Sequence, residues 1–149
     1  MRLTTQSEYA LVCLRALGQD GSGHPLSVSV IAAREHMSKD YVEQLFLKLK
    51  RAGIVKSVKG VHGGYLLAKE PSMIKIREVI EALEGNVYEV FCSPEIRERI
   101  VCMHFDHCSI RPIWFKLKEL IDDFFERITL DTLLKNESAV VEQLSEVTA

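Results

Sequence analysis

The 149-residue sequence lacks the features of membrane proteins and of common enzymes. No apolar run approaches the ~20 residues that span a bilayer, and residues 1–5 contain no apolar signal-peptide core. There is no nucleophile–base set, and the glycine-rich stretch 60–64 lacks the Lys-Ser/Thr pair of a phosphate loop. We therefore expect a cytoplasmic protein that is not an enzyme and does not contact a membrane.

Acidic residues are absent between Gln44 and Lys69, a stretch that contains six basic residues. The net charge of −2 conceals a wider asymmetry, because residues 1–75 carry 11 Lys/Arg and 6 Asp/Glu, whereas residues 76–149 carry 8 and 15. A split of this kind is typical of a protein in which one half binds nucleic acid.

Only four cysteines are present, and three of them, Cys92, Cys102 and Cys108, fall within seventeen residues. Clustered cysteines in a cytosolic protein indicate metal or redox chemistry. Zinc with His104 or His107 as the fourth ligand is one interpretation, although the close Cys pair of most zinc sites is missing. A disulfide between two of the three is another. The remaining cysteine, Cys13, is expected to be a small buried hydrophobe.

The first half of the chain has the spacing of a helix-turn-helix. A helix is predicted over 5–17, with Thr5 and Glu8 as a capping box. A second helix is predicted over 28–35 and a third over 38–52, separated by a short turn and ended by Gly53.

The residues after this motif predict a wing and a long helix. Strands are expected over 54–59 and 65–67 around the glycine-rich turn, followed by a helix over 74–83. Residues 86–109 are irregular, and the helix over 110–128 has an apolar stripe that is too broad for one small domain to cover. We therefore expect a second subunit to bury part of that stripe.

The predicted fold is mainly α with a small β-hairpin: a winged helix-turn-helix plus a long C-terminal dimerisation helix. The chain is expected to divide into four regions. Residues 1–84 form the DNA-binding region and 85–109 the cysteine-bearing cofactor loop. Residues 110–134 form the dimerisation helix and a short terminal helix, and 135–149 form a flexible tail.

Side-chain chemistry on the third helix and the hairpin favours double-stranded DNA as a partner. Gln44 can form paired hydrogen bonds with adenine in the major groove. Glycines such as Gly60 let the wing backbone approach DNA closely. Phosphate neutralisation is predicted for four nearby cations: Lys48, Lys50, Arg51 and Lys56.

The run over 38–46, its continuation to residue 65, the opening residues 1–4 and the run over 128–133 together resemble the Rrf-type winged-helix transcription regulators. The resemblance covers about residues 1–134. It implies a homodimer that binds DNA through Ser38, Tyr41, Gln44, Lys59 and Gly60. Two departures concern sequence preference: Asp40 stands where a small hydroxyl residue is frequent, and Lys59 replaces the arginine of several members.

Within this family the resemblance is to the IscR- and NsrR-like iron–sulfur sensors. It implies that Cys92, Cys102 and Cys108 hold a cluster, either 4Fe-4S or 2Fe-2S. Arg111 stands at the position where IscR-like members have a histidine ligand. Glu8 of the partner subunit matches the acidic ligand of NsrR-like members. The expected function is transcription regulation, as a repressor, in response to iron–sulfur status, nitric oxide or redox state. The alternatives are a regulator with a zinc or thiol–disulfide site, and an adaptor that acts through a protein partner.

Overall fold

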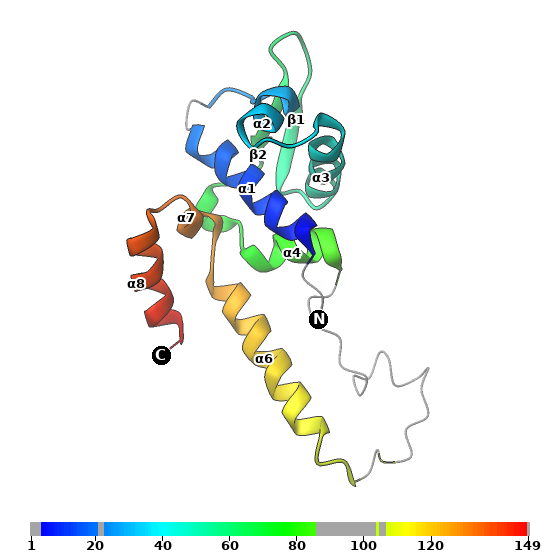
Figure 1. Ribbon diagram of the computed structural model, residues 1–149, viewed down its shortest axis with the longest axis vertical. Coiled ribbons are helices and arrows are strands. Elements are labelled where there is room, and N and C mark those ends of the chain that lie inside the picture. Colours follow the sequence, from blue (N-terminus) through cyan, green and yellow to red (C-terminus); the bar gives the residue numbers. More distant parts are fainter. Residues whose placement is uncertain (1–3, 21–22, 86–103, 105–106, 149) are drawn as a thin grey trace.

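The computed structural model describes residues 4–20, 23–85, 104 and 107–148. Helices α1 to α4 and one hairpin gather into a head, from which α6 extends away (Figure 1). No helix in these ranges is long and apolar enough to cross a membrane. The elements in order are α1 (Thr5–Asp20), α2 (Val28–Arg34), α3 (Lys39–Arg51), β1 (Val55–Val58), β2 (Gly64–Leu67), the 3-10 turn η1 (Pro71–Met73), α4 (Ile76–Glu84), α6 (Arg111–Arg127), α7 (Leu130–Leu133) and α8 (Glu137–Thr148).

Local capping signals define the two helices of the predicted helix-turn-helix. The hydroxyl of Ser27 accepts a hydrogen bond from the Val30 N–H at 3.3 Å, and α2 begins at the next residue after the serine. Ser38 begins α3 in the same way, accepting from the Tyr41 N–H at 3.3 Å. Gly53, at φ 71°, ends the motif in a conformation that favours glycine.

The core of the head lies between α1, α3 and α4. Its apolar side chains come from the helical stripes that the sequence predicted, and Phe46 of α3 is fully buried at its centre. A well-packed core fixes the orientation of each helix, because a side chain that shifts leaves a cavity behind it. Helix α3, the second helix of the helix-turn-helix, is therefore held by its inner face while its outer face remains in solvent.

The wing is anchored to the head at its base. Strands β1 and β2 pair antiparallel, with Val55 opposite Leu67. Tyr65 exchanges two backbone hydrogen bonds with Leu26, at 3.0 and 2.8 Å, and its ring packs on Phe46 at a centroid distance of 4.7 Å. A Cβ at Gly64 would lie 2.2 Å from the Leu26 oxygen, so only glycine allows this approach.

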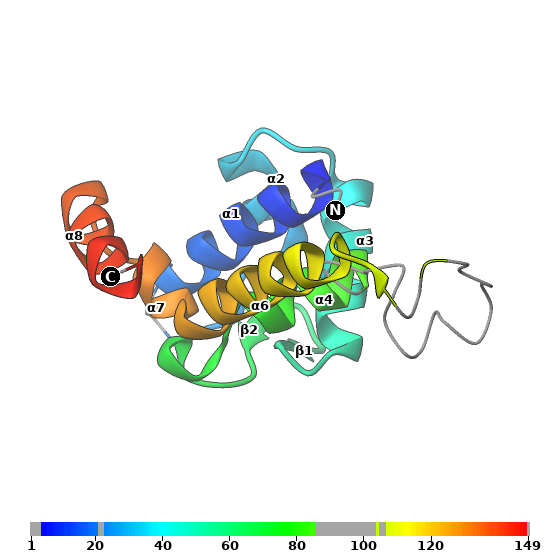
Figure 2. The ribbon, with the colours of Figure 1, turned by 90° about the horizontal axis from the view of Figure 1, so that it is seen from below.

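Among the described residues, helix α6 contacts mainly α4 and α8, and none of its seventeen residues is buried. Its C-terminal half packs through Ile121, Phe124 and Phe125 on a small cluster formed by Ile76 of α4 and its neighbours. Its N-terminal half carries exposed apolar side chains: Ile113, Trp114, Leu117 and Leu120. Seen from below, α6 lies in front of the head, with α8 to one side of it (Figure 2).

The predicted flexible tail over 135–149 is wrong, because Glu137–Thr148 form α8. Asn136 supplies the missing start signal: its Oδ1 accepts a hydrogen bond from the Ala139 N–H at 2.9 Å. The apolar side chain of Leu144 then packs against the same cluster that holds α6. The acidic composition obscured a short amphipathic pattern that tertiary contact stabilises.

The start of α1 also differs from the prediction. The hydroxyl of Thr4, rather than that of Thr5, accepts a hydrogen bond from the Gln6 N–H, at 3.2 Å, and the Thr4 carbonyl accepts from the Ser7 N–H at 3.1 Å. The helix continues to Asp20, three residues beyond the predicted end. Since Thr4 performs the capping role, the predicted Thr5–Glu8 capping box is not formed.

Candidate DNA interface and cofactor ligands

The outer face of α3 presents three of the predicted DNA contacts. Ser38, Gln44 and Arg51 are exposed, and Arg51 belongs to a basic last turn. The helix N-terminus beside Ser38 carries the positive end of the helix dipole, which favours phosphate. This face can therefore meet both base edges and the DNA backbone.

Tyr41 and Lys48 lie on the edge of α3 that faces α1, and both are half-buried. The Tyr41 ring meets Tyr9 edge-on, at a centroid distance of 5.9 Å and an interplanar angle of 90°. The Lys48 ammonium donates to Gln6 Oε1 at 2.7 Å and to the Leu83 carbonyl at 3.4 Å. Lys48 was predicted to neutralise phosphate, but the structure places its charge against α1 and α4.

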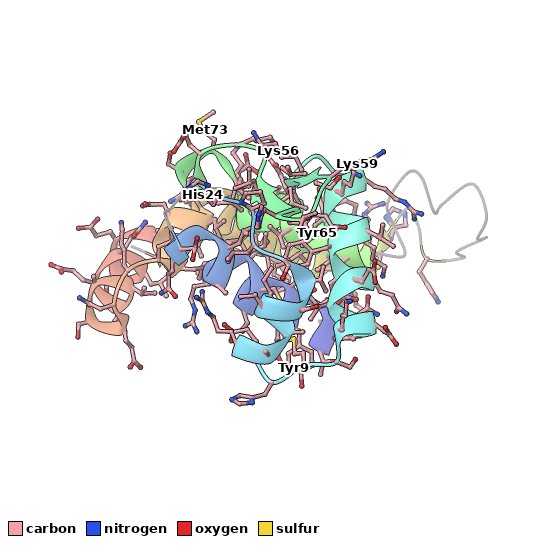
Figure 3. All side chains as sticks on the ribbon, turned by 90° about the horizontal axis from the view of Figure 1, so that it is seen from above. Tyr9, His24, Lys56, Lys59, Tyr65 and Met73 are labelled. Atoms are coloured by element: carbon pink, nitrogen blue, oxygen red, sulfur yellow. The ribbon has the colours of Figure 1, made fainter. Side chains whose placement is uncertain are left out.

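The wing carries the remaining predicted contacts. Lys56, Lys59 and Gly60 are all exposed, and Gly60 has φ 120°. Figure 3 shows Lys56 and Lys59 on the hairpin side of the head, with Tyr9 on the opposite side. The Lys50 ammonium donates to Ser57 Oγ at 2.7 Å and so links α3 to β1. The exposed cations Lys50, Arg51, Lys56 and Lys59 therefore come from the last turn of α3 and the adjoining wing, whereas the first part of α3 also exposes Asp40 and Glu43.

A carboxylate at the end of α4 is bound to the start of α1. Glu84 Oε1 accepts hydrogen bonds from the Thr4 N–H at 3.1 Å, from the Thr4 hydroxyl, and from the Ser7 hydroxyl at 2.8 Å. Partial burial alone would raise the pKa of Glu84, but these hydrogen bonds outweigh it and lower the pKa below its ordinary value. The carboxylate is thus ionised and held at neutral pH.

The predicted ligand Glu8 lies in the first turn of α1 and is exposed. Within the described ranges its carboxylate has no hydrogen bond or ion pair. The rival role of Glu8, helix capping, belongs to Thr4 instead. Among the described residues nothing pairs with the Glu8 carboxylate, so it is able to act as a ligand.

The cysteines differ sharply in environment. Cys13 is fully buried, and its Sγ lies 3.8 Å from Met37 Sδ. Burial, with a contribution from Glu35, raises the pKa of the Cys13 thiol to about 12, so it is neither a thiolate nor a ligand. This confirms the prediction of a structural cysteine. Cys108, just before α6, is a half-buried free thiol.

The rest of the predicted cofactor site cannot be assembled from the described residues. Cys92 and Cys102 lie outside them. His104 and His107 are exposed. No group of three potential metal ligands comes together within the part of the chain that the structure describes.

Sequence reasoning missed the residues that join α1, α3 and α4. Thr4 and Ser7 contact Glu84 across 80 and 77 positions, and Gln6 contacts Lys48 across 42. No local sequence pattern predicts contacts between residues so far apart in the chain, because each of these residue types is also common at solvent-exposed helix ends.

Sequence comparison places the chain among transcription regulators. A family model described as Rrf2, iron-dependent transcriptional regulator, matches residues 3–136. IscR of Pectobacterium atrosepticum is 34% identical over 140 residues, covering 94% of this chain and 83% of that protein. IscR of Escherichia coli O1:K1 is 33% identical over 140 residues, covering 94% and 84%. These relatives are HTH-type regulators and not enzymes.

Solved structures agree on the fold. CymR of B. subtilis, the global cysteine regulator, aligns with a TM-score of 0.74 at 29% identity, covering 90% of this chain and 96% of that one. IscR of T. potens aligns with a TM-score of 0.67 at 30% identity, covering 100% and 92%. The predicted mainly helical winged-helix fold is confirmed by these matches. With its family model matched over nearly the whole length, the chain belongs to the Rrf2 family of DNA-binding transcriptional regulators.

Proposed function

We propose that this protein is a homodimeric regulator, acting as a repressor, whose affinity for its operator depends on an iron–sulfur cluster. The observation that carries the proposal is the chemistry of two described donors. The Cys108 thiol is free, and the Glu8 carboxylate is exposed and unpaired within the described ranges. Iron–sulfur clusters take thiolates as ligands, and a carboxylate completes such a set as a weaker, exchangeable one.

The proposed DNA interface is α3 together with the wing. Gln44 and the residues around Ser38 would read base edges, while Arg51 and Lys56 neutralise phosphates. Lys59 and Gly60 would approach the neighbouring groove, and Tyr41 would contact DNA from the edge that also meets Tyr9. Lys48 remains a candidate for long-range attraction only, because its ammonium is held by Gln6.

The proposed dimer forms through the N-terminal half of α6. Ile113 is 64% exposed and Leu120 is 57% exposed, so this face leaves much apolar area in water. A second copy of the helix would remove that area from solvent. A two-fold dimer would then present two α3 helices to half-sites about one helical turn apart, or a multiple of it.

The donor set fits a cluster bound between subunits. Cys92, Cys102 and Cys108 would supply three thiolates, and Glu8 of the partner subunit would supply the fourth ligand. When bound, the cluster would supply iron that reacts with oxygen or nitric oxide. The chain's own contribution is to fix Glu8 on the first turn of α1, close to the residues that contact α3.

Anaerobic purification followed by visible absorption and analysis of iron, sulfide and zinc tests the proposal. We expect iron and sulfide in the wild type, loss of both in Cys102→Ala, and a dimer in each. Cys13→Ala is the matched control, since its buried thiol predicts no loss of cofactor. Operator affinity, measured by gel shift, should change in Cys102→Ala. One zinc per chain would favour the zinc alternative.

A sample that stays free of metal after reconstitution would favour the thiol–disulfide or adaptor readings. Equal operator affinity with and without cofactor would contradict the sensing mechanism. In the adaptor reading, a protein partner would co-purify and be required for DNA binding.

A further inference from the structure

Three elements meet at the side chain of Lys48. The lysine belongs to α3, its ammonium donates to Gln6 in the first turn of α1 at 2.7 Å, and it donates to the Leu83 carbonyl near the end of α4 at 3.4 Å. We infer that Lys48 is a positioning residue through which the cofactor region sets the orientation of the recognition helix. This inference rests on the proposed function.

The contact with α1 flanks the proposed ligand. Helix α3 meets the first part of α1 through two side-chain pairs, Lys48 with Gln6 and Tyr41 with Tyr9. Glu8 lies between Gln6 and Tyr9 in the sequence, on the same helical turn. A displacement of Glu8 on gain or loss of a ligand therefore reaches both contacts, because a helical turn moves as a unit.

The contact with α4 adjoins the segment that leads to the cysteines, which in the proposed dimer hold a different cluster from the one that Glu8 of the same chain reaches. Leu83 and Glu84 are the last residues of α4, and Gly85 then leads toward Cys92. Glu84 accepts hydrogen bonds from Thr4 and Ser7, so the end of α4 and the start of α1 are bound to each other as well as to Lys48. Lys48 thus links α3 to two segments that adjoin proposed ligands: the first turn of α1, which carries Glu8, and the end of α4, which precedes Cys92.

Lys48 suits this role because of where it lies on α3. It is half-buried on the α1-facing edge, whereas Gln44 and Arg51 are exposed on the outer face. Its long side chain carries three donors, which allows it to bond two acceptors on different helices. Allosteric coupling requires one element whose equilibrium position both sites influence, and α3 is that element here.

The test compares the operator dissociation constants of cofactor-free and cofactor-loaded protein, measured by fluorescence anisotropy across a salt series. The quantity followed is the ratio of the larger constant to the smaller. In Lys48→Met we expect this ratio to fall at least threefold toward one, with an unchanged salt slope. Arg51→Met is the matched control on the same helix. It should lower the salt slope by about one, as expected for a lost phosphate contact, and keep the wild-type ratio.

A second variant keeps the charge. Gln6→Leu removes the principal acceptor of Lys48 and leaves the ammonium in place, so it should lower the ratio in the same way while the salt slope stays fixed. It also serves if Lys48→Met fails to fold, as judged by circular dichroism. An unchanged ratio in the folded variants, or a salt slope lowered by about one in Lys48→Met, would overturn the inference.

The wild type separates the two proposals. A wild-type ratio of one contradicts the proposed function, and the inference falls with it. A wild-type ratio well above one that persists in both variants overturns the positioning role of Lys48 alone.

Discussion

Helices α4 and α6 are both amphipathic, yet their apolar faces have opposite fates. In the nine residues of α4, Ile76, Val79, Ile80 and Leu83 are all buried. In the seventeen residues of α6, none is. The face of α4 is covered by α1, α3 and the C-terminal half of α6, whereas the other half of α6 extends past the head (Figure 1).

The comparison shows that the helical period predicts which face is apolar but not what covers it. Burial of apolar area is the main favourable term in folding, and a helix that leaves half of its apolar face exposed gains less from it. The head therefore contains its own stabilising contacts, whereas the N-terminal part of α6 gains little from contacts within the described part of the chain.

Removing a core side chain from the head should produce the largest effect. Phe46→Ala is expected to lower the free energy of unfolding by about 3–5 kcal/mol, because it leaves a cavity in a filled core. Urea denaturation followed by circular dichroism measures this. Leu47→Ala, at the next position and 45% exposed, is the control, with an expected loss below about 1 kcal/mol. Equal losses would contradict the distinction.

A charge introduced on the exposed N-terminal half of α6 should weaken the proposed homodimer and leave the head of each subunit folded. Trp114 is 44% exposed within the subunit, so Trp114→Glu costs the monomer little. In a dimer it would bury an unpaired carboxylate, and the dissociation constant should rise at least tenfold, about 1.4 kcal/mol. Sedimentation velocity measures it. Lys116→Ala, at an exposed ion pair with Glu119, is the control and should leave the dimer intact.

The junction between α1 and α4 predicts a smaller, pH-dependent effect. Glu84→Gln should cost about 1 kcal/mol at pH 7, because the hydrogen bonds to the charged group are weakened. The folded-state pKa of Glu84 lies below its ordinary value, so its contribution is complete above that value and is lost as the pH falls through the folded pKa. The difference from wild type should therefore shrink on acidification.

Urea unfolding at a series of pH values measures this difference. Glu78→Gln, which removes an exposed ion pair with Lys69, is the comparison and should cost less than about 0.5 kcal/mol. A Glu84→Gln penalty that stays constant down to acid pH would contradict the assigned cause.

Local signals accounted for most of the head. Ser27, Ser38 and Gly53 mark helix ends through interactions within a few residues, so the sequence alone predicts them. Two boundaries were missed where such signals compete. Thr4 and Thr5 are equivalent in sequence, and only the contact of Thr4 with Glu84 selects between them. For α8, the start signal Asn136 was outweighed by acidic composition.

The direction of long side chains could not be predicted. Lys48, Lys50 and Arg51 are adjacent cations on one helix, and all three were assigned to phosphates. The first is bound to α1 and α4, the second to Ser57, and the third is exposed. A flexible side chain takes the partner that tertiary structure places within its reach, and that partner is set by contacts distant in sequence.

The pairing of Leu26 with Tyr65 has a consequence for the thermodynamics of DNA recognition. Ordering one residue of backbone costs about 1–2 kcal/mol in conformational entropy. Since these hydrogen bonds already fix the base of the wing in the free protein, that cost is met during folding and does not reduce the affinity for the operator. In the proposed interface the wing would therefore meet the DNA with the backbone at its base already ordered.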